Sequence, residues 1–133
     1  MGLIVVDAGI IIAILDSSDA HHEPSQRALS VALGNASTLI VPASAYAETL
    51  VAPFRAGPQK AAVVDTFLDA LPATVQPITR RIARTAAELR ARHGSRLRLP
   101  DALVVATALE LHADQVLTTD RRWPDVEVRI EAV

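Results

Sequence analysis

The sequence contains no cysteine, and this absence excludes several kinds of chemistry. Disulfide frameworks, thiolate zinc sites and cysteine nucleophiles all require a thiol. Long apolar runs are missing as well. The first run, at residues 3–6, is interrupted by Asp7, whereas a membrane span needs about 18 apolar residues, and it lacks the basic start of a signal peptide. We therefore expect a cytoplasmic protein that does not associate with a membrane.

Aromatic residues and lysine are scarce, at 3% of the chain and a single Lys60. Few aromatics argue against a surface that stacks the bases of single-stranded nucleic acid. The 13 basic and 15 acidic residues nearly cancel, so the chain lacks the positive field of a general nucleic-acid binder. Seven arginines lie between Arg80 and Arg98. A solvated helix face is the favoured explanation of this run, and a stripe that contacts phosphates is the alternative.

The 133 residues, of which 50% are hydrophobic, show a regular alternation of short apolar runs and amphipathic segments. One compact domain over residues 1–133 is expected at this length. Strands are expected at residues 3–6, 38–41, 74–78, 115–118 and 126–130, the last of them at an edge of the sheet. Helices are expected at residues 8–15, 22–33, 43–54, 61–71, 79–93 and 101–112. This order predicts an α/β sandwich around a mostly parallel sheet of four to five strands, flanked by helices.

The positions of three acidic residues, Asp7, Glu48 and Asp120, can be compared with these elements. Asp7 directly follows the first strand and Asp120 lies two residues beyond the fourth, so both are expected at the carboxyl edge of the sheet. Open α/β sheets have their functional crevice at this edge. Taken singly, each is explained more simply as a helix cap. Glu48 lies about 140° from Ala43 on the helical wheel, so periodicity predicts an ordinary solvated glutamate.

Asp101 is harder to explain as a surface residue. At about 100° per residue it shares one side of its helix with Val104, Val105 and Ala108. An unpaired carboxylate buried there would cost several kcal/mol, so it must be protonated, paired with arginine or bound to a metal ion. The helix dipole favours the ionised form. The residues alone leave an Asp–Arg pair and a metal ligand open as alternatives.

Taken together, the acids resemble those of the PIN-domain ribonucleases and, more narrowly, of VapC-type toxins from type II toxin–antitoxin pairs. The resemblance covers essentially the whole chain. It rests on the N-terminal Asp7, on Glu48 in a mid-chain helix, and on the runs Leu99-Pro100-Asp101-Ala102 and Leu117-Thr118-Thr119-Asp120. It implies a single PIN-like domain, a three-layer sandwich whose acids converge at one end of the sheet. The implied activity is that of a metal-dependent endoribonuclease, which hydrolyses RNA phosphodiester bonds with a metal-activated water.

The resemblance also assigns roles to individual residues. It implies that Asp7, Glu48, Asp101 and Asp120 are catalytic. Asp7 and Asp101 would be the main metal ligands, Asp120 a third or water-mediated ligand, and Glu48 a ligand or the base for the attacking water. Thr118 is expected to support Asp120 through its hydroxyl. Mg²⁺ is the expected ion and Mn²⁺ an alternative, which agrees with the preference of hard cations for carboxylate oxygens.

Gly9 departs from the family pattern, which usually has serine, threonine or asparagine two residues after the first aspartate. This departure keeps a second hypothesis open, namely a catalytically inactive PIN-like domain that serves as a binding module. Two other acidic-pocket classes are disfavoured. A haloacid-dehalogenase-like phosphatase would need an aspartate at position 9, and a receiver domain would need a lysine late in the chain, whereas Lys60 is in its middle.

The partners implied by the resemblance are an RNA substrate, a second copy in a homodimer, and a cognate antitoxin whose C-terminal segment occupies an apolar groove. The groove is expected between the helices at residues 43–54 and 61–71. Its lining would be the apolar residues Tyr46, Leu50, Phe54, Val64, Phe67 and Leu68. For each of these residues alone, core packing is the simpler interpretation. A nearly neutral protein also needs local basic groups to hold RNA. The arginines between residues 80 and 98, or Arg121 and Arg122, are the candidates.

Overall fold

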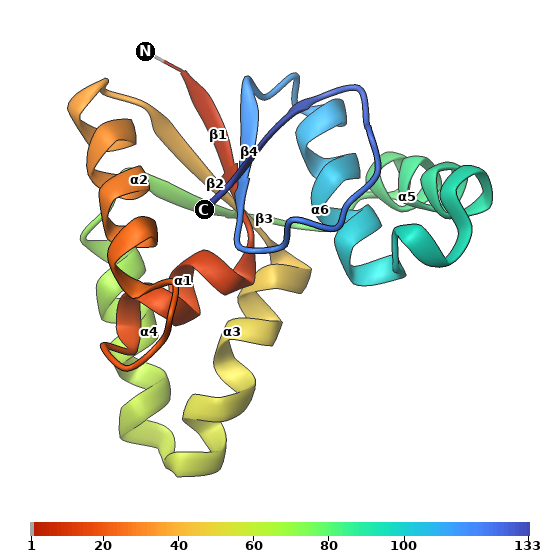
Figure 1. The fold of residues 1–133 in the computed structure, drawn as a ribbon. Coiled ribbons are helices and arrows are strands. Elements are labelled where there is room, and N and C mark those ends of the chain that lie inside the picture. The colour runs from red at the N-terminus through yellow and green to blue at the C-terminus, as the bar shows by residue number, and fades with distance from the viewer. Residues whose placement is uncertain (1) are drawn as a thin grey trace.

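A computed structural model describes residues 2–133 and shows a sheet between two groups of helices (Figure 1). The strands are β1 Leu3–Val6, β2 Thr38–Pro42, β3 Ala73–Gln76, β4 Gln115–Thr118 and β5 Arg129–Ala132. The helices are α1 Ala8–Leu15, α2 His22–Gly34, α3 Ala43–Ala56, α4 Pro58–Asp69, α5 Arg80–His93 and α6 Leu99–Glu110, with a short turn η1 Gly94–Arg96 between the last two. Within residues 2–133, no helix is both long enough and apolar enough to span a bilayer.

The five strands are all parallel, in the order β3-β2-β1-β4-β5, which confirms the predicted sheet. The chain adds β2 and β3 on one side of β1 and places β4 and β5 on the other. The direction of winding therefore reverses between β1 and β4, and such a switch point opens a crevice beyond the carboxyl ends of the strands. Val6 pairs with Leu117, so the residues that follow them, Asp7 and Thr118, lie side by side at this crevice.

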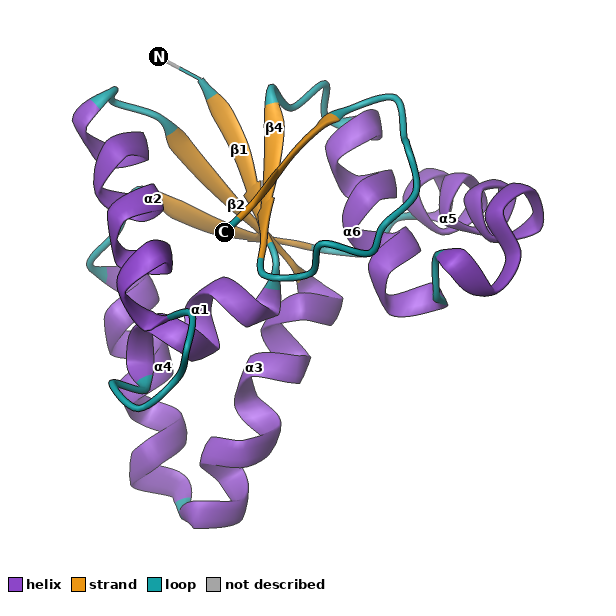
Figure 2. Cartoon of the chain, in the orientation of Figure 1, coloured by secondary structure: helices purple, strands orange, loops and turns teal. Residues whose placement is uncertain are grey.

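The hydrophobic core has two parts, which correspond to the two groups of helices in Figure 2. In the first part, α1, α2 and α4 pack on the sheet around Val5, Ile10 and Leu39. In the second, α5 packs against α6 around Leu89 and Val105. The central part of α6 is buried, as its nearly uninterrupted apolar sequence predicts. The helix that begins with Leu99-Pro100-Asp101 is therefore held firmly between the sheet and α5.

Several element boundaries differ from those predicted. The last strand, expected at residues 126–130, is β5 at Arg129–Ala132. Val126 and Val128 instead pack onto the core from the preceding loop, so their alternation reflects burial rather than strand pairing. β3 ends at Gln76 rather than at residue 78, because Pro77 has no N–H to donate to a neighbouring strand.

α3 buries a different face from the one predicted. Its fully buried residues are Ala45 and Thr49, whereas Ala47 and Phe54 of the predicted apolar stripe are exposed. Figure 1 shows the reason, because α3 and α4 form a hairpin that projects beyond the carboxyl edge of the sheet. The outer half of this hairpin has no sheet to cover, so its apolar side chains remain on the surface.

Candidate active site

Asp7 is buried between the end of β1 and the start of α1. It is the N-cap of α1, and its Oδ1 accepts the backbone N–H of Ala8 at 2.9 Å. Its own N–H donates to the Leu117 carbonyl at 2.9 Å, which fixes it against β4. Its Oδ2 accepts the Thr118 hydroxyl at 2.7 Å. Asp7 is therefore a helix cap, as the simpler interpretation predicts, and its carboxylate is also held at the crevice between β1 and β4.

Thr118 connects two of the acids, Asp120 as predicted and Asp7 in addition. Its hydroxyl donates to Asp7 and accepts the backbone N–H of Asp120 at 3.1 Å. The expectation that Thr118 supports Asp120 through its hydroxyl is confirmed, and the contact is to the backbone N–H of Asp120. A fully buried threonine thus orients the Asp7 carboxylate and fixes the backbone that presents Asp120.

Asp101 lies half-buried in the first turn of α6, and the structure gives its carboxylate no hydrogen bond within residues 2–133. The ion pairs of this part of the chain do not include it either, so the Asp–Arg pair left open by the sequence does not form. Loss of solvent raises the pKa of Asp101, and the charges of Asp7 and Asp120 raise it further. Arg98 and Arg122 lie near enough to oppose this rise in pKa. Asp101 is an unpartnered carboxylate that faces two others.

Glu48 is exposed on α3, as its helical periodicity predicts, yet it belongs to the same group of acids. Its pKa is raised, first by partial loss of solvent and then by the charge of Asp101, while Arg98 acts in the opposite direction. Periodicity within α3 could not reveal this neighbour, because Asp101 comes from another helix.

Asp120 already has a cationic partner in Arg122. The Arg122 backbone N–H donates to Oδ1 at 2.8 Å, and the guanidinium approaches the two carboxylate oxygens at 3.2 and 3.4 Å. Partial burial raises the pKa of Asp120, but the hydrogen bonds and charge of Arg122 together outweigh burial and hold this pKa below its ordinary value. The Arg122 side chain is 86% exposed, so the ion pair is a weak one.

The four acids therefore act on one another at the carboxyl edge of the sheet, although they are not gathered into a closed cage. Among residues 2–133, no three acidic or histidine side chains are close enough to hold a metal ion as they stand. Like charges repel in a site with little water, and this repulsion contributes to the raised pKa values of Asp7, Glu48 and Asp101. A divalent cation would relieve the repulsion. The donors fit a hard ion such as Mg²⁺ or Mn²⁺, because all are carboxylate oxygens and Asp101 has no other partner.

The side chain of Thr119, which the sequence did not single out, packs against Gly9. A β-carbon built on Gly9 would overlap the Thr119 hydroxyl oxygen and lie 3.4 Å from its Cβ. Thr119 stands between Thr118 and Asp120 at the end of β4. A threonine hydroxyl therefore lies beside position 9 although Gly9 itself has no side chain. The only sequence signal for this packing is a glycine in the first turn of a helix, where glycine is otherwise unfavourable.

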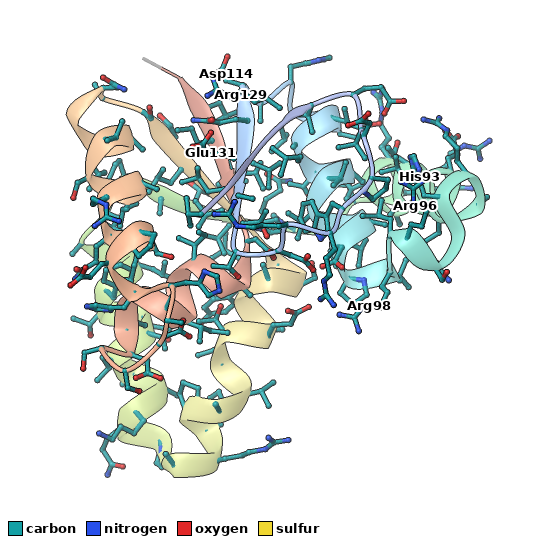
Figure 3. The ribbon with its side chains drawn as sticks, viewed as in Figure 1. His93, Arg96, Arg98, Asp114, Arg129 and Glu131 are labelled. Carbon is teal, nitrogen blue, oxygen red and sulfur yellow. The ribbon has the colours of Figure 1, made fainter. Side chains whose placement is uncertain are left out.

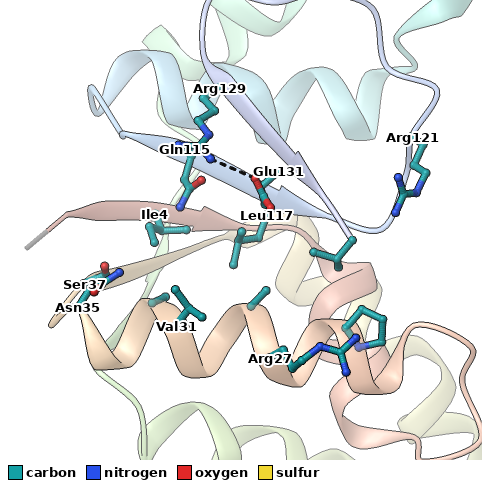
Figure 4. A pocket seen from close by; sticks show the side chains of 14 residues that line it. Ile4, Arg27, Val31, Asn35, Ser37, Gln115, Leu117, Arg121, Arg129 and Glu131 are labelled. Carbon is teal, nitrogen blue, oxygen red and sulfur yellow. Dashed lines mark hydrogen bonds and ion pairs between the residues drawn. The ribbon is translucent and has the colours of Figure 1, made fainter.

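A cavity of about 540 Å³ lies away from the four acids, between α2 and the strands β4 and β5 (Figure 4). None of the four acids lines it. Two of its arginines are already paired, Arg129 with Glu131 at 3.3 Å and Arg27 with Glu23 at 3.9 Å. This cavity contributes nothing to the acidic site.

A model of the PIN domain family matches residues 4–128, so this chain belongs to the PIN domain family and the predicted resemblance is confirmed. A comparison of the sequence with curated proteins gave no match.

Solved structures of the same fold come from toxin–antitoxin systems. VapC20 of Mycobacterium tuberculosis, described as a toxin that cleaves the sarcin-ricin loop, is 22% identical with a TM-score of 0.73, over 95% of this chain and 98% of that one. VapBC2 of Rickettsia felis, bound to promoter DNA, is 16% identical with a TM-score of 0.76, over 98% of both chains. FitAcB of Neisseria gonorrhoeae is 18% identical with a TM-score of 0.72, over 96% and 95% of the two chains. At these identities the similarity establishes the fold.

Proposed function

We propose that this protein, as one PIN domain over residues 1–133, is the toxin of a toxin–antitoxin pair and acts as a metal-dependent endoribonuclease. The observation that carries the proposal is Asp101, a half-buried carboxylate that has no partner within residues 2–133 and lies near Asp7 and Asp120. These acids lie at the switch point of the sheet, where α/β folds bind their ligands. Membership of the PIN family and the similarity to the toxin VapC20 support the same activity.

In this proposal Asp7, Asp101 and Asp120 hold Mg²⁺ or Mn²⁺, and Glu48 is a further ligand or the base. A bound divalent ion lowers the pKa of water and neutralises charge on phosphodiester oxygens. Thr118 keeps the Asp7 carboxylate oriented and favours its ionised form. The raised pKa of Glu48 brings its carboxylate nearer to the value that suits proton uptake from the attacking water.

Cleavage of RNA by the purified protein tests the proposal. A hairpin with the sarcin-ricin sequence is a suitable first probe, and mapping of new 5′ ends after brief induction would identify cellular targets. Asp101→Asn should reduce cleavage by more than about 100-fold, because even partners that only orient a metal ligand contribute 10- to 100-fold. Asp69→Asn, an exposed aspartate at the end of α4, is the matched control and should cleave normally.

Wild-type cleavage that survives EDTA, or an Asp101→Asn variant that cleaves at the wild-type rate, would refute the proposal. Calorimetric titration with Mn²⁺ separates it from the inactive binding module. A chain that binds its antitoxin but no divalent ion would support the binding module instead.

We also propose that a cognate antitoxin binds the apolar groove between α1, α3 and α4. This groove has a volume of about 330 Å³ and combines exposed apolar residues, among them Ile12 and Val63, with the single Lys60. Solved toxin–antitoxin complexes from Rickettsia felis, Neisseria gonorrhoeae and Klebsiella pneumoniae share this fold, which supports a partner of this kind.

The groove lies between the predicted pair of helices, but other residues line it. Val64 is the one member of the predicted set that it contains. Leu68 is buried in the core and Phe67 packs against it. Tyr46 donates its hydroxyl to Asp65 at 2.5 Å. The simpler interpretation, core packing, is therefore correct for Val64, Leu68 and Phe67. Tyr46 and Leu50 also pack against the core, whereas Phe54 is exposed.

Val63→Asp tests this partner site, because Val63 is 54% exposed in the groove and the fold should tolerate the change. The variant should remain toxic when co-expressed with the co-transcribed neighbour that neutralises the wild type. Val31→Asp, 64% exposed on α2 outside the groove, should still be neutralised. Equal neutralisation of both variants would contradict the assignment. A homodimer is proposed as well, and sedimentation equilibrium measures it.

A further inference from the structure

The seven arginines between Arg80 and Arg98 do not form one stripe. Four of them contact groups in or next to α5: Arg81 pairs with Glu110, Arg84 lies near Glu88, Arg90 donates to the carbonyls of Gly94 and Leu97, and Arg92 pairs with Glu127. The other three, Arg80, Arg96 and Arg98, are in no ion pair within residues 2–133. Of these three, only Arg96 and Arg98 line the cavity described next. Both lie on the stretch that joins α5 to α6, and Figure 3 labels them on the same side of the molecule as His93.

Arg96 and Arg98 line a cavity of about 300 Å³ together with Arg122. We call these three residues the arginine cluster. Asp101 and Asp120 form another part of the same wall, so the cavity continues directly into the acidic site. Its volume lies at the lower end of the range for ligand-binding pockets. Three arginines, from η1, the start of α6 and the β4–β5 loop, therefore line one space beside the acids.

The acids do not neutralise the arginine cluster completely. Arg98 acts on the pKa values of Glu48, Asp101 and Asp120, yet it forms no ion pair with any of them. Arg122 does pair with Asp120, but its side chain is 86% exposed and such a pair exchanges readily. The fork of a guanidinium group matches the oxygens of a phosphate better than a lysine ammonium does. The cluster thus offers donors to an anion larger than a single carboxylate.

We propose that the arginine cluster binds a phosphate of the RNA chain beside the cleaved bond. The inference rests on the proposed function and adds to it the residues that position the substrate. It includes an exchange: when a divalent ion binds Asp120, that carboxylate no longer needs Arg122, and the Arg122 guanidinium turns to the RNA phosphate. The remaining arginines of the run, apart from Arg96 and Arg98, take no part.

Fluorescence anisotropy with a labelled single-stranded RNA 12-mer tests the proposal. Ca²⁺ replaces Mg²⁺ in the binding buffer, and a gel confirms that the RNA stays intact. Arg96→Gln, Arg98→Gln and Arg122→Gln should each weaken binding about 5- to 10-fold at 0.1 M salt. Each should also reduce the slope of log K against log[salt], by at most about 0.7, the value for loss of the whole phosphate contact on a single strand. Arg84→Gln removes the same charge from an 82% exposed side chain and should change neither quantity.

Calorimetry with Mn²⁺ alone gives a second measurement, the affinity for the ion. This affinity would not change if Arg122 had only a structural role. Arg122→Gln should bind Mn²⁺ more tightly than the wild type, because Asp120 loses its competing cation, while Arg84→Gln should match the wild type. Wild-type RNA affinity and salt slope in all three cluster variants, in a protein that cleaves RNA, would overturn this inference and leave the proposed function intact. A wild type that binds RNA through the cluster but never cleaves it would support the inference and refute the nuclease.

Discussion

Replacement of Thr118 by valine tests how the chain holds the Asp7 carboxylate. Valine keeps the shape of threonine but removes the hydroxyl that donates to Asp7 at 2.7 Å and accepts from the Asp120 N–H at 3.1 Å. Thr118 is fully buried and Asp7 is only 9% exposed. Water therefore cannot replace either bond, and both groups lose a partner.

The expected loss of unfolding free energy follows from the two bonds. A hydrogen bond to a charged group contributes about 1.5–3 kcal/mol and a neutral one about 0.5–1.5 kcal/mol, so Thr118→Val should lose about 2–4.5 kcal/mol when Asp7 is ionised. Burial raises the pKa of Asp7 above 3.8, and the Thr118 bond limits this rise. The variant therefore has a still higher Asp7 pKa. The loss of unfolding free energy that depends on ionised Asp7 should be absent in acid. It should grow as the pH passes the Asp7 pKa of the wild type and become constant above the Asp7 pKa of the variant.

Urea unfolding followed by circular dichroism at several pH values measures both effects. Thr118→Ser keeps the hydroxyl and should lose about 1 kcal/mol, the value of one buried methyl group. Thr107→Val is the matched control, since Thr107 is also buried but donates to the Leu103 carbonyl within α6. That bond adds little to a helix, so its loss should be small and independent of pH. Equal losses in Thr118→Val and Thr107→Val, without a pH-dependent difference, would refute the reasoning.

Other substitutions test the repulsion among the acids and the packing around Gly9. Because the pKa of Asp101 is raised above 3.8, its ionised form destabilises the metal-free fold, and Asp101→Asn should raise the melting temperature at pH 7 but not below pH 3.8. Saturating Mg²⁺ should reduce or reverse that difference in thermal melts, because the ion stabilises the wild type more. Gly9→Ala should lose about 1–3 kcal/mol in urea unfolding, and Thr119→Ala in the same chain should recover most of it. A stabilising Gly9→Ala, as at an ordinary helix position, would contradict the packing.

The sheet could be predicted because its inner strands are short apolar runs that end at a proline or a polar residue. The bounds of β5 could not be predicted. Alternating apolar residues at 126–130 are compatible with burial against the core whether or not the backbone pairs with a strand. Val126 and Val128 are partly buried against the core without being part of β5. The buried face of α3 was mispredicted for a related reason. A helical wheel predicts which side is apolar, whereas Phe54 is exposed because the hairpin extends past the sheet.

The positions of the acids along the chain were predictable, but their contacts were not. One strand is followed by Asp7, and another ends at Thr118 and is followed by Asp120. This order places the three groups at one edge of any parallel sheet. Which of them touch depends on the register of β1 against β4, and that register sets Asp7 beside Thr118. The sequence carries no local signal for it. The approach of Glu48 to Asp101 likewise depends on how two helices pack.

The near-neutral net charge of −2 conceals a strong local separation of charge. Four carboxylates and the three guanidinium groups of the arginine cluster meet at the carboxyl edge and together carry one net negative charge. One divalent ion changes this to one net positive charge. An RNA phosphate approaching the metal-free site meets unpartnered Asp101 and an Arg122 that is bound to Asp120. In the proposed exchange, a bound ion would neutralise the carboxylates and release Arg122. Binding should therefore be ordered, with the metal first and RNA second, and RNA affinity should rise with the occupancy of the ion.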